Sequence, residues 1–137
     1  MDKSLKYYVF KDKRIVFEIL KGNFELNDYF DLKKAEILDK DYDPNFDFIL
    51  DLRFTDFVFS EIIENEMARY IDFAKSIQVI SKRRKTALIT RTPEQVVNSI
   101  LHQSLDDRNI DFKIFSTFEA AFKWIGIIDF DIKLIIE

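Results

Sequence analysis

The order of its apolar segments is the feature that most constrains how this chain can fold. Two apolar and β-branched runs, residues 7–10 and 14–20, are separated by a three-residue polar break, which is typical of a β-hairpin. Three further runs, at 46–52, 86–90 and 111–115, each follow a segment with helical periodicity. The sequence therefore predicts the order β-β-α-β-α-β-α-β-α, in which helical crossovers make the last four strands parallel.

Capping signals mark the helices. A first helix is predicted from the cap Asn27 to about residue 41, a second from Ser60 to about 79, and a short fourth helix between 116 and Gly126. Thr92 precedes a third helix, with Pro93 suited to its first position and Gln95 completing a capping box. The apolar residues of this helix that are predicted to form its buried stripe are Val97, Leu101 and Leu105.

Polar residues interrupt every predicted parallel strand at a period of two. They are Arg14, Glu18, Asp47, Asp51, Thr86, Thr90, Asp111 and Lys113. Parallel strands that are covered on both faces usually appear as unbroken apolar runs. We therefore expect one polar sheet face, all helices on the other face and strands in sequential order, which is a one-sided β-α superhelix.

Three segments, at 48–53, 85–89 and 115–125, resemble the SpoIIAA-like (STAS-like) superfamily. The likeness covers residues 5–126 and is strongest with an uncharacterised bacterial branch near STAS and CRAL-TRIO domains. It implies an α/β fold with a mixed, mostly parallel sheet and helices on one face, and a general habit of binding proteins or anionic ligands. Anti-sigma-factor antagonists of this superfamily carry an Asp-Ser-Ser-Gly-like turn whose serine is phosphorylated. Residues 51–60 contain no Asp-Ser pair and no Gly, so the usual phosphoserine switch is not expected.

Composition excludes several function classes. The chain has no Cys and one histidine, His102, without a nucleophile or ligand partner at a recognisable spacing, so we expect no metal, no cofactor and no enzymatic activity. Asp106 and Asp107 are interpreted as solvated charges. The net charge of −4 argues against nucleic acid as a partner. The sequence has neither a signal-peptide pattern nor an apolar run of membrane-spanning length, and it predicts a cytoplasmic protein.

One candidate ligand site lies at the carboxyl edge of the predicted sheet. Arg53 leaves the third strand there, and Arg91 leaves the fourth strand directly before the helix that begins after Thr92. Two guanidinium groups and the N–H groups of a helix start suit a carboxylate or a phosphate. Asp51 and Asp56 are close enough in sequence to occupy both arginines instead.

Two weaker candidates follow from charge and position. Ser60 could accept a phosphoryl group at the start of the second helix, although a serine there is usually a cap. A basic loop could bind a phosphate, an anionic lipid head group or an acidic partner, or could be a solvated loop neutralised by the acidic segment 39–43. This loop consists of Lys82, Arg83, Arg84 and Lys85.

Residues 127–137 alternate apolar and polar side chains with strand periodicity. We expect a single domain over 1–126 followed by a strand-like extension over 127–137. The extension could cover this chain's own sheet, or it could form the interface strand of a homodimer, which is the arrangement we predict.

The leading function predicted is a non-enzymatic binding or regulatory module of the STAS-like type that recognises a protein partner through its second helix. The alternative is a carrier or sensor of a small anionic or lipid-like ligand.

Overall fold

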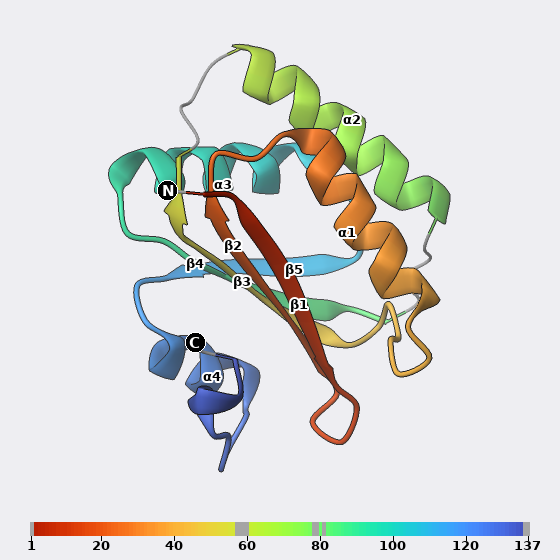
Figure 1. Cartoon of the computed structure of the whole chain (residues 1–137), viewed down its shortest axis with the longest axis vertical. Coiled ribbons are helices and arrows are strands. Elements are labelled where there is room, and N and C mark those ends of the chain that lie inside the picture. Colours follow the sequence, from red (N-terminus) through yellow and green to blue (C-terminus); the bar gives the residue numbers. More distant parts are fainter. Residues whose placement is uncertain (1, 57–60, 78–79, 81, 136–137) are drawn as a thin grey trace.

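The computed structural model describes residues 2–56, 61–77, 80 and 82–135. Its five strands form one sheet in the order β1-β2-β3-β4-β5 (Figure 1). β1 is antiparallel to β2, and the remaining pairs are parallel. These elements confirm the predicted sequential order. The strands are Ser4–Phe10, Ile15–Gly22, Asp47–Thr55, Arg84–Ile89 and Ile110–Phe115.

The helices lie on both faces of the sheet (Figure 1). α1 (Leu26–Leu38), α2 (Glu61–Ile77) and α3 (Pro93–Leu105) cover one face, and α4 (Phe118–Ile125) lies on the opposite face. The expectation that all helices share one face therefore holds for three of the four. α1 begins two residues earlier than predicted, with Glu25 and not Asn27 as its cap, because the Asp28 carboxylate accepts a hydrogen bond from the N–H of Glu25 and closes the first turn there.

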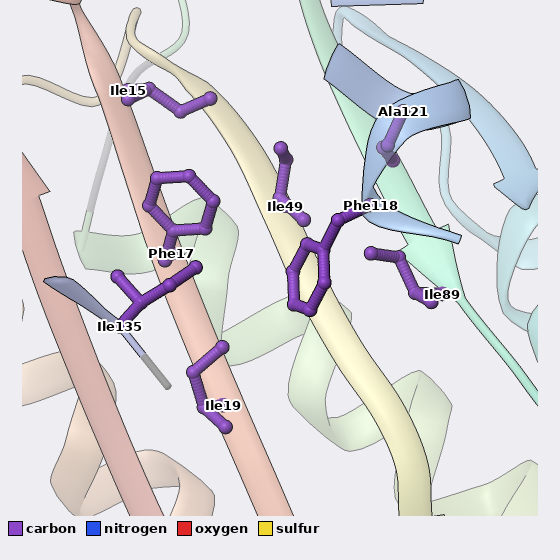
Figure 2. Packing of buried hydrophobic residues seen from close by; sticks show 9 residues of the cluster. Ile15, Phe17, Ile19, Ile49, Ile89, Phe118, Ala121 and Ile135 are labelled. Carbon is purple, nitrogen blue, oxygen red and sulfur yellow. The ribbon is translucent and has the colours of Figure 1, made fainter. Parts of the chain in front are cut away.

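A hydrophobic core explains why α4 lies on the second face. Phe118 of α4 packs between Ile49 of β3 and Ile89 of β4, and Ile135 lies against β2 (Figure 2). These side chains are almost completely buried, and burying each large one stabilises the fold by about 1.5–3 kcal/mol. The second face is therefore a packed core.

The polar strand residues are divided between the two faces, which corrects the prediction of one open polar face. In the register of β2, β3 and β4, Thr86 lies beside Phe48 on the face that α1, α2 and α3 cover. Glu18 is on this same face, next to Leu50, whereas Asp51 is on the α4 face. The period-two pattern therefore combines enclosed polar residues, such as Glu18 and Thr86, with exposed ones, such as Arg14 and Lys113, and does not mark one solvent-facing side.

The strand predicted over 127–137 does not form in the part of this segment that the structure describes. Gly126 (φ 94°) and Asp129 (φ 54°) turn the chain in the left-handed region, and Ile132–Leu134 forms a 3₁₀ helix. Phe130 stacks on Phe17 with a centroid distance of 5.0 Å. The segment thus covers the sheet of its own chain, as the in-chain alternative required. The homodimer stays a prediction.

Candidate functional site

A cavity of about 150 Å³ lies between the sheet and the layer of α1, α2 and α3. We call it the helix-side cavity. Its apolar wall includes Leu20, Phe24, Leu26, Leu50, Leu52 and Leu88. Its polar wall contains Glu18, Lys33, Arg84, Thr86, Asn98, His102 and Arg108.

Strand register separates a polar part of the cavity from an apolar part. Arg84, Thr86 and Leu88 follow one another at alternate positions of β4, so their side chains point to the same face. Thr86 is level with Phe48 of β3, and Leu88 is level with Leu50. The cavity floor therefore changes from cationic and polar to apolar along β4.

Arg84 is a buried cation at the polar end, with 3% of its surface exposed. Its Nη1 donates to the carbonyl oxygen of Pro44 at 3.0 Å, and its guanidinium lies 4.1 Å from the centre of the Phe48 ring. Among the residues that the structure describes, no carboxylate lies within ion-pair distance of it, and its Nε has no hydrogen-bond partner. Burial, reinforced by the charge of Arg108, lowers the pKa of Arg84. A buried cation without a counter-ion is unfavourable by several kcal/mol.

Arg108 carries a second guanidinium at this end, but it is paired. Its Nη2 donates to Asp106 Oδ2 at 2.6 Å and its Nε to Oδ1 at 3.0 Å. His102 Nε2 lies 3.3 Å from the same carboxylate. Burial opposes ionisation of Asp106, but the hydrogen bonds from His102 and Arg108 outweigh it and hold its pKa well below the usual range. Asp106 is therefore a buried counter-ion, and its interpretation as a solvated charge was wrong.

Buried polar atoms without partners belong to four residues that line the cavity. Neither amide atom of Asn98, the hydroxyl of Thr86, Arg84 Nε nor Arg108 Nη1 has a hydrogen-bond partner within the described chain. Asn98 and Thr86 are 7% and 3% exposed. Because buried polar groups are normally hydrogen-bonded, five such atoms on one wall indicate a place where a ligand or water completes the bonding.

An ionic cluster lies on the α1 side of the cavity. Lys33 Nζ lies 3.0 Å from both Glu18 Oε2 and Glu36 Oε2, and the Tyr29 hydroxyl donates to Glu18. Burial, together with the charge of Glu18, raises the pKa of Glu36 to about 9, so Glu36 is neutral at pH 7. The charges of Lys33 and Glu18 then cancel, and the charge of Arg84 is left uncompensated.

The sequence contained a signal for this cluster that was not used. Tyr29, Lys33 and Glu36 are spaced as i, i+4 and i+7, so they occupy one helix face with the apolar residues of α1. A lysine and a glutamate at such positions indicate buried partners in the neighbouring sheet.

Arg53, Arg91 and Thr92 lie together at the carboxyl edge, as predicted. Arg91 Nε donates to the Arg53 carbonyl oxygen at 3.1 Å, and both guanidinium groups lie over the Phe54 ring. Asp51 accepts two hydrogen bonds of 2.9 Å from Arg53, and the Thr92 hydroxyl caps α3 by accepting from the Gln95 N–H. Anion binding at this edge stays a prediction. Ser60 lies outside the described residues.

The predicted basic loop is in part a strand, because β4 begins at Arg84. Arg83 precedes the strand and pairs with Asp111, which is level with Lys85 on the face opposite to Arg84. Arg83 Nε donates to Asp111 at 2.7 Å, the Lys85 ammonium donates to the Trp124 carbonyl oxygen, and the backbone N–H of Lys82 donates to Asn45. The carboxylate that neutralises Arg83 is thus in β5, which corrects the expected pairing with segment 39–43.

α3 buries the face opposite to the one expected. Its polar residues Gln95, Asn98 and Ser99 are buried, whereas Val97 is 47% exposed and Leu105 37% exposed. The predicted Thr92–Gln95 capping box is confirmed. The helix turns its polar side toward the sheet because the cavity wall and the end of β3 supply polar surroundings, including the Arg53 carbonyl oxygen that accepts from Gln95.

Comparison with known proteins identifies the fold. No protein-family model and no curated protein matches the sequence. A solved structure similar to this chain is that of an uncharacterised protein of the DUF3478 family with a SpoIIAA-like fold from Shewanella loihica PV-4. The TM-score is 0.58 at 12% identity, and the match covers 90% of this chain and 93% of that chain. The chain therefore has a SpoIIAA-like fold, which confirms the resemblance.

Two features are absent from the described residues. None of the helices described is both long and apolar enough to cross a membrane. No group of three or more potential metal ligands occurs among those residues.

Proposed function

We propose that this protein is a non-enzymatic binding module that carries or senses a small anionic, partly apolar molecule in the helix-side cavity. The observation that supports this function best is the buried guanidinium of Arg84, which has no carboxylate partner among the described residues and faces a cavity with an apolar far wall. A bound anion supplies the missing counter-charge, and the apolar wall binds the rest of the molecule.

The bonding of the cavity side chains supports binding over catalysis. The Ser99 hydroxyl donates to the Gln95 carbonyl oxygen and not to a base, so it is not arranged as an activated nucleophile. Lys33 is held by two carboxyl groups. These contacts hold the charged side chains of the cavity in fixed positions, which suits the binding of a ligand.

Native mass spectrometry of the freshly purified protein tests this function. We expect a small bound mass that is lost on denaturation. Leu88→Phe fills the apolar end of the cavity and should reduce the bound fraction, whereas Leu105→Phe, at an exposed position of α3, should leave it unchanged. If the protein carries no small mass and binds none of the compounds tested below, the cavity is filled by water and the proposal is wrong.

A second candidate is the recognition of a protein partner, as for STAS-like domains. It is favoured by the exposed apolar side chains of α3, where Ile100 is 54% exposed and lies on the outer surface with Val97 and Leu105. Ile100→Asp should abolish capture of a specific partner, whereas Gln103→Asp on the same helix should not. An equal loss with both variants would contradict a role for this surface.

A further inference from the structure

Resting on the proposed function, we propose that the ligand is a small monocarboxylate with an aromatic or short aliphatic body. Its carboxylate binds between Arg84 and Arg108, where Asn98 and Thr86 complete its hydrogen bonds, and its body lies toward Leu50 and Leu88.

The count of fixed charges favours a ligand with one negative charge. Around the cavity, Lys33 lies within ion-pair distance of both Glu18 and Glu36, and Arg108 is paired with Asp106. Burial and the charge of Glu18 raise the pKa of Glu36, so Glu36 is counted as neutral and Lys33 is balanced by Glu18 alone. Arg84 is the cation left without a carboxylate among the described residues. A monoanion restores neutrality, whereas a dianion such as a phosphate monoester leaves a second charge buried without a partner.

The unpartnered atoms match the bonding capacity of a carboxylate. Arg84 Nε, Arg108 Nη1 and Asn98 Nδ2 are donors, and the Thr86 hydroxyl can donate as well. A carboxylate has two oxygens with about four lone-pair sites between them and no donor. The corresponding amide could donate its NH₂ group to Asn98 Oδ1, the one unpartnered amide oxygen, but it brings no negative charge to pair with Arg84, and an amine brings a second positive charge.

The volume of the cavity limits the body of the ligand. A cavity of about 150 Å³ in another protein holds a benzene molecule. The apolar end therefore accepts an aromatic ring or a chain of similar size, with about six to ten non-hydrogen atoms in the whole ligand. A fatty acid with sixteen carbons exceeds this space.

Titration calorimetry at pH 7.5 with three molecules of nearly equal size tests whether the ligand is a carboxylate. Phenylacetate is the anion, phenylacetamide its neutral counterpart and 2-phenylethylamine the cation. We expect phenylacetate to bind at least tenfold more tightly than the amide, and the amine to show no binding. Hexanoate should bind and hexadecanoate should not, while inorganic phosphate should bind at least tenfold more weakly than phenylacetate.

Variants link this preference to the residues named. Arg84→Met keeps a long side chain and removes the charge, so the ratio of phenylacetate to phenylacetamide affinity should fall to about one. The matched control is Arg83→Met, which removes a guanidinium on the opposite side of the strand and should keep the wild-type ratio. If Arg84→Met does not fold, Thr86→Val supplies the test, because it removes one hydroxyl without changing size and should weaken phenylacetate alone.

The outcomes separate this inference from the function on which it rests. If the amide binds as tightly as the acid, or if the Arg83 and Arg84 variants behave alike, the carboxylate class is wrong while the cavity remains a binding site. If none of the compounds binds and no small mass copurifies, the function and the class fail together.

Discussion

Replacing Arg84 by methionine should stabilise the ligand-free protein. A buried ion without a counter-ion destabilises a fold by several kcal/mol. Against this, the substitution removes one hydrogen bond to the Pro44 carbonyl oxygen and one contact with the Phe48 ring, which together contribute about 2–3 kcal/mol. The balance is a gain of about 1–2 kcal/mol, since methionine fills a similar volume and contacts aromatic rings favourably. For a chain of this length, that gain raises the melting temperature by about 5 °C.

Urea and thermal unfolding, followed by circular dichroism, measure this effect with and without phenylacetate. The Arg84→Met variant should have the higher midpoint without ligand and should lose the additional shift that phenylacetate gives the wild type. Arg83→Met should change neither quantity appreciably, because the Arg83–Asp111 pair lies in solvent.

One result would refute the reasoning. If ligand-free Arg84→Met were less stable than the wild type by about 2 kcal/mol or more, Arg84 would already be compensated within the protein. The helix-side cavity would then have no need of an anion, whatever its volume.

Three other predictions can be checked with the same instruments. Burial raises the pKa of Glu36 to about 9, so the folded protein holds a proton that the unfolded chain releases near pH 4.5. The free energy of unfolding should therefore fall as the pH rises from 6 to 8.5, by at most about 1.4 kcal/mol per pH unit. In urea titrations, Glu36→Gln should flatten this slope. Phe130→Ala should destabilise the protein by about 3 kcal/mol, and truncation after Gly126 should lower the melting temperature. The homodimer prediction requires in addition that this truncation change the oligomeric state, which light scattering measures. At the carboxyl edge, sulfate should raise the melting temperature of the wild type more than that of Arg91→Ala, and equal shifts would exclude the anion site predicted there.

The element order could be predicted from the sequence because periodicity and caps act locally. The Thr92–Gln95 capping box is an example, since both of its hydrogen bonds join residues within one turn. The layering could not be predicted in the same way. Whether Phe118 covers the same face as α1 depends on where the chain crosses the sheet edge after β5, and the side-chain pattern of α4 is compatible with either face.

The C-terminal segment shows a second limit. Apolar residues alternate from Ile128 to Ile136, as in a strand, but Asp129 adopts a positive φ and Asp131 caps a 3₁₀ turn by accepting from the Lys133 N–H. Short polar side chains stabilise such turns locally. In a segment with no adjacent strand to pair with, this local preference for a turn outweighs the strand periodicity of the sequence.

The site itself was missed because the same polar residues were interpreted as signs of solvent. Arg84 and Thr86 share a strand face with Leu88, and that face lies beneath three helices. On a covered face, a polar residue needs a partner, and the helix above supplies one only if its own inner side is polar. Asn98 on the inner side of α3 and Arg84 of β4 are therefore polar for the same reason, although a loop and a helix start separate them in the sequence. Arg84 Nε and both amide atoms of Asn98 lack partners within the described chain, and a ligand that completes their hydrogen bonds explains why α3 exposes Val97 and buries its amides.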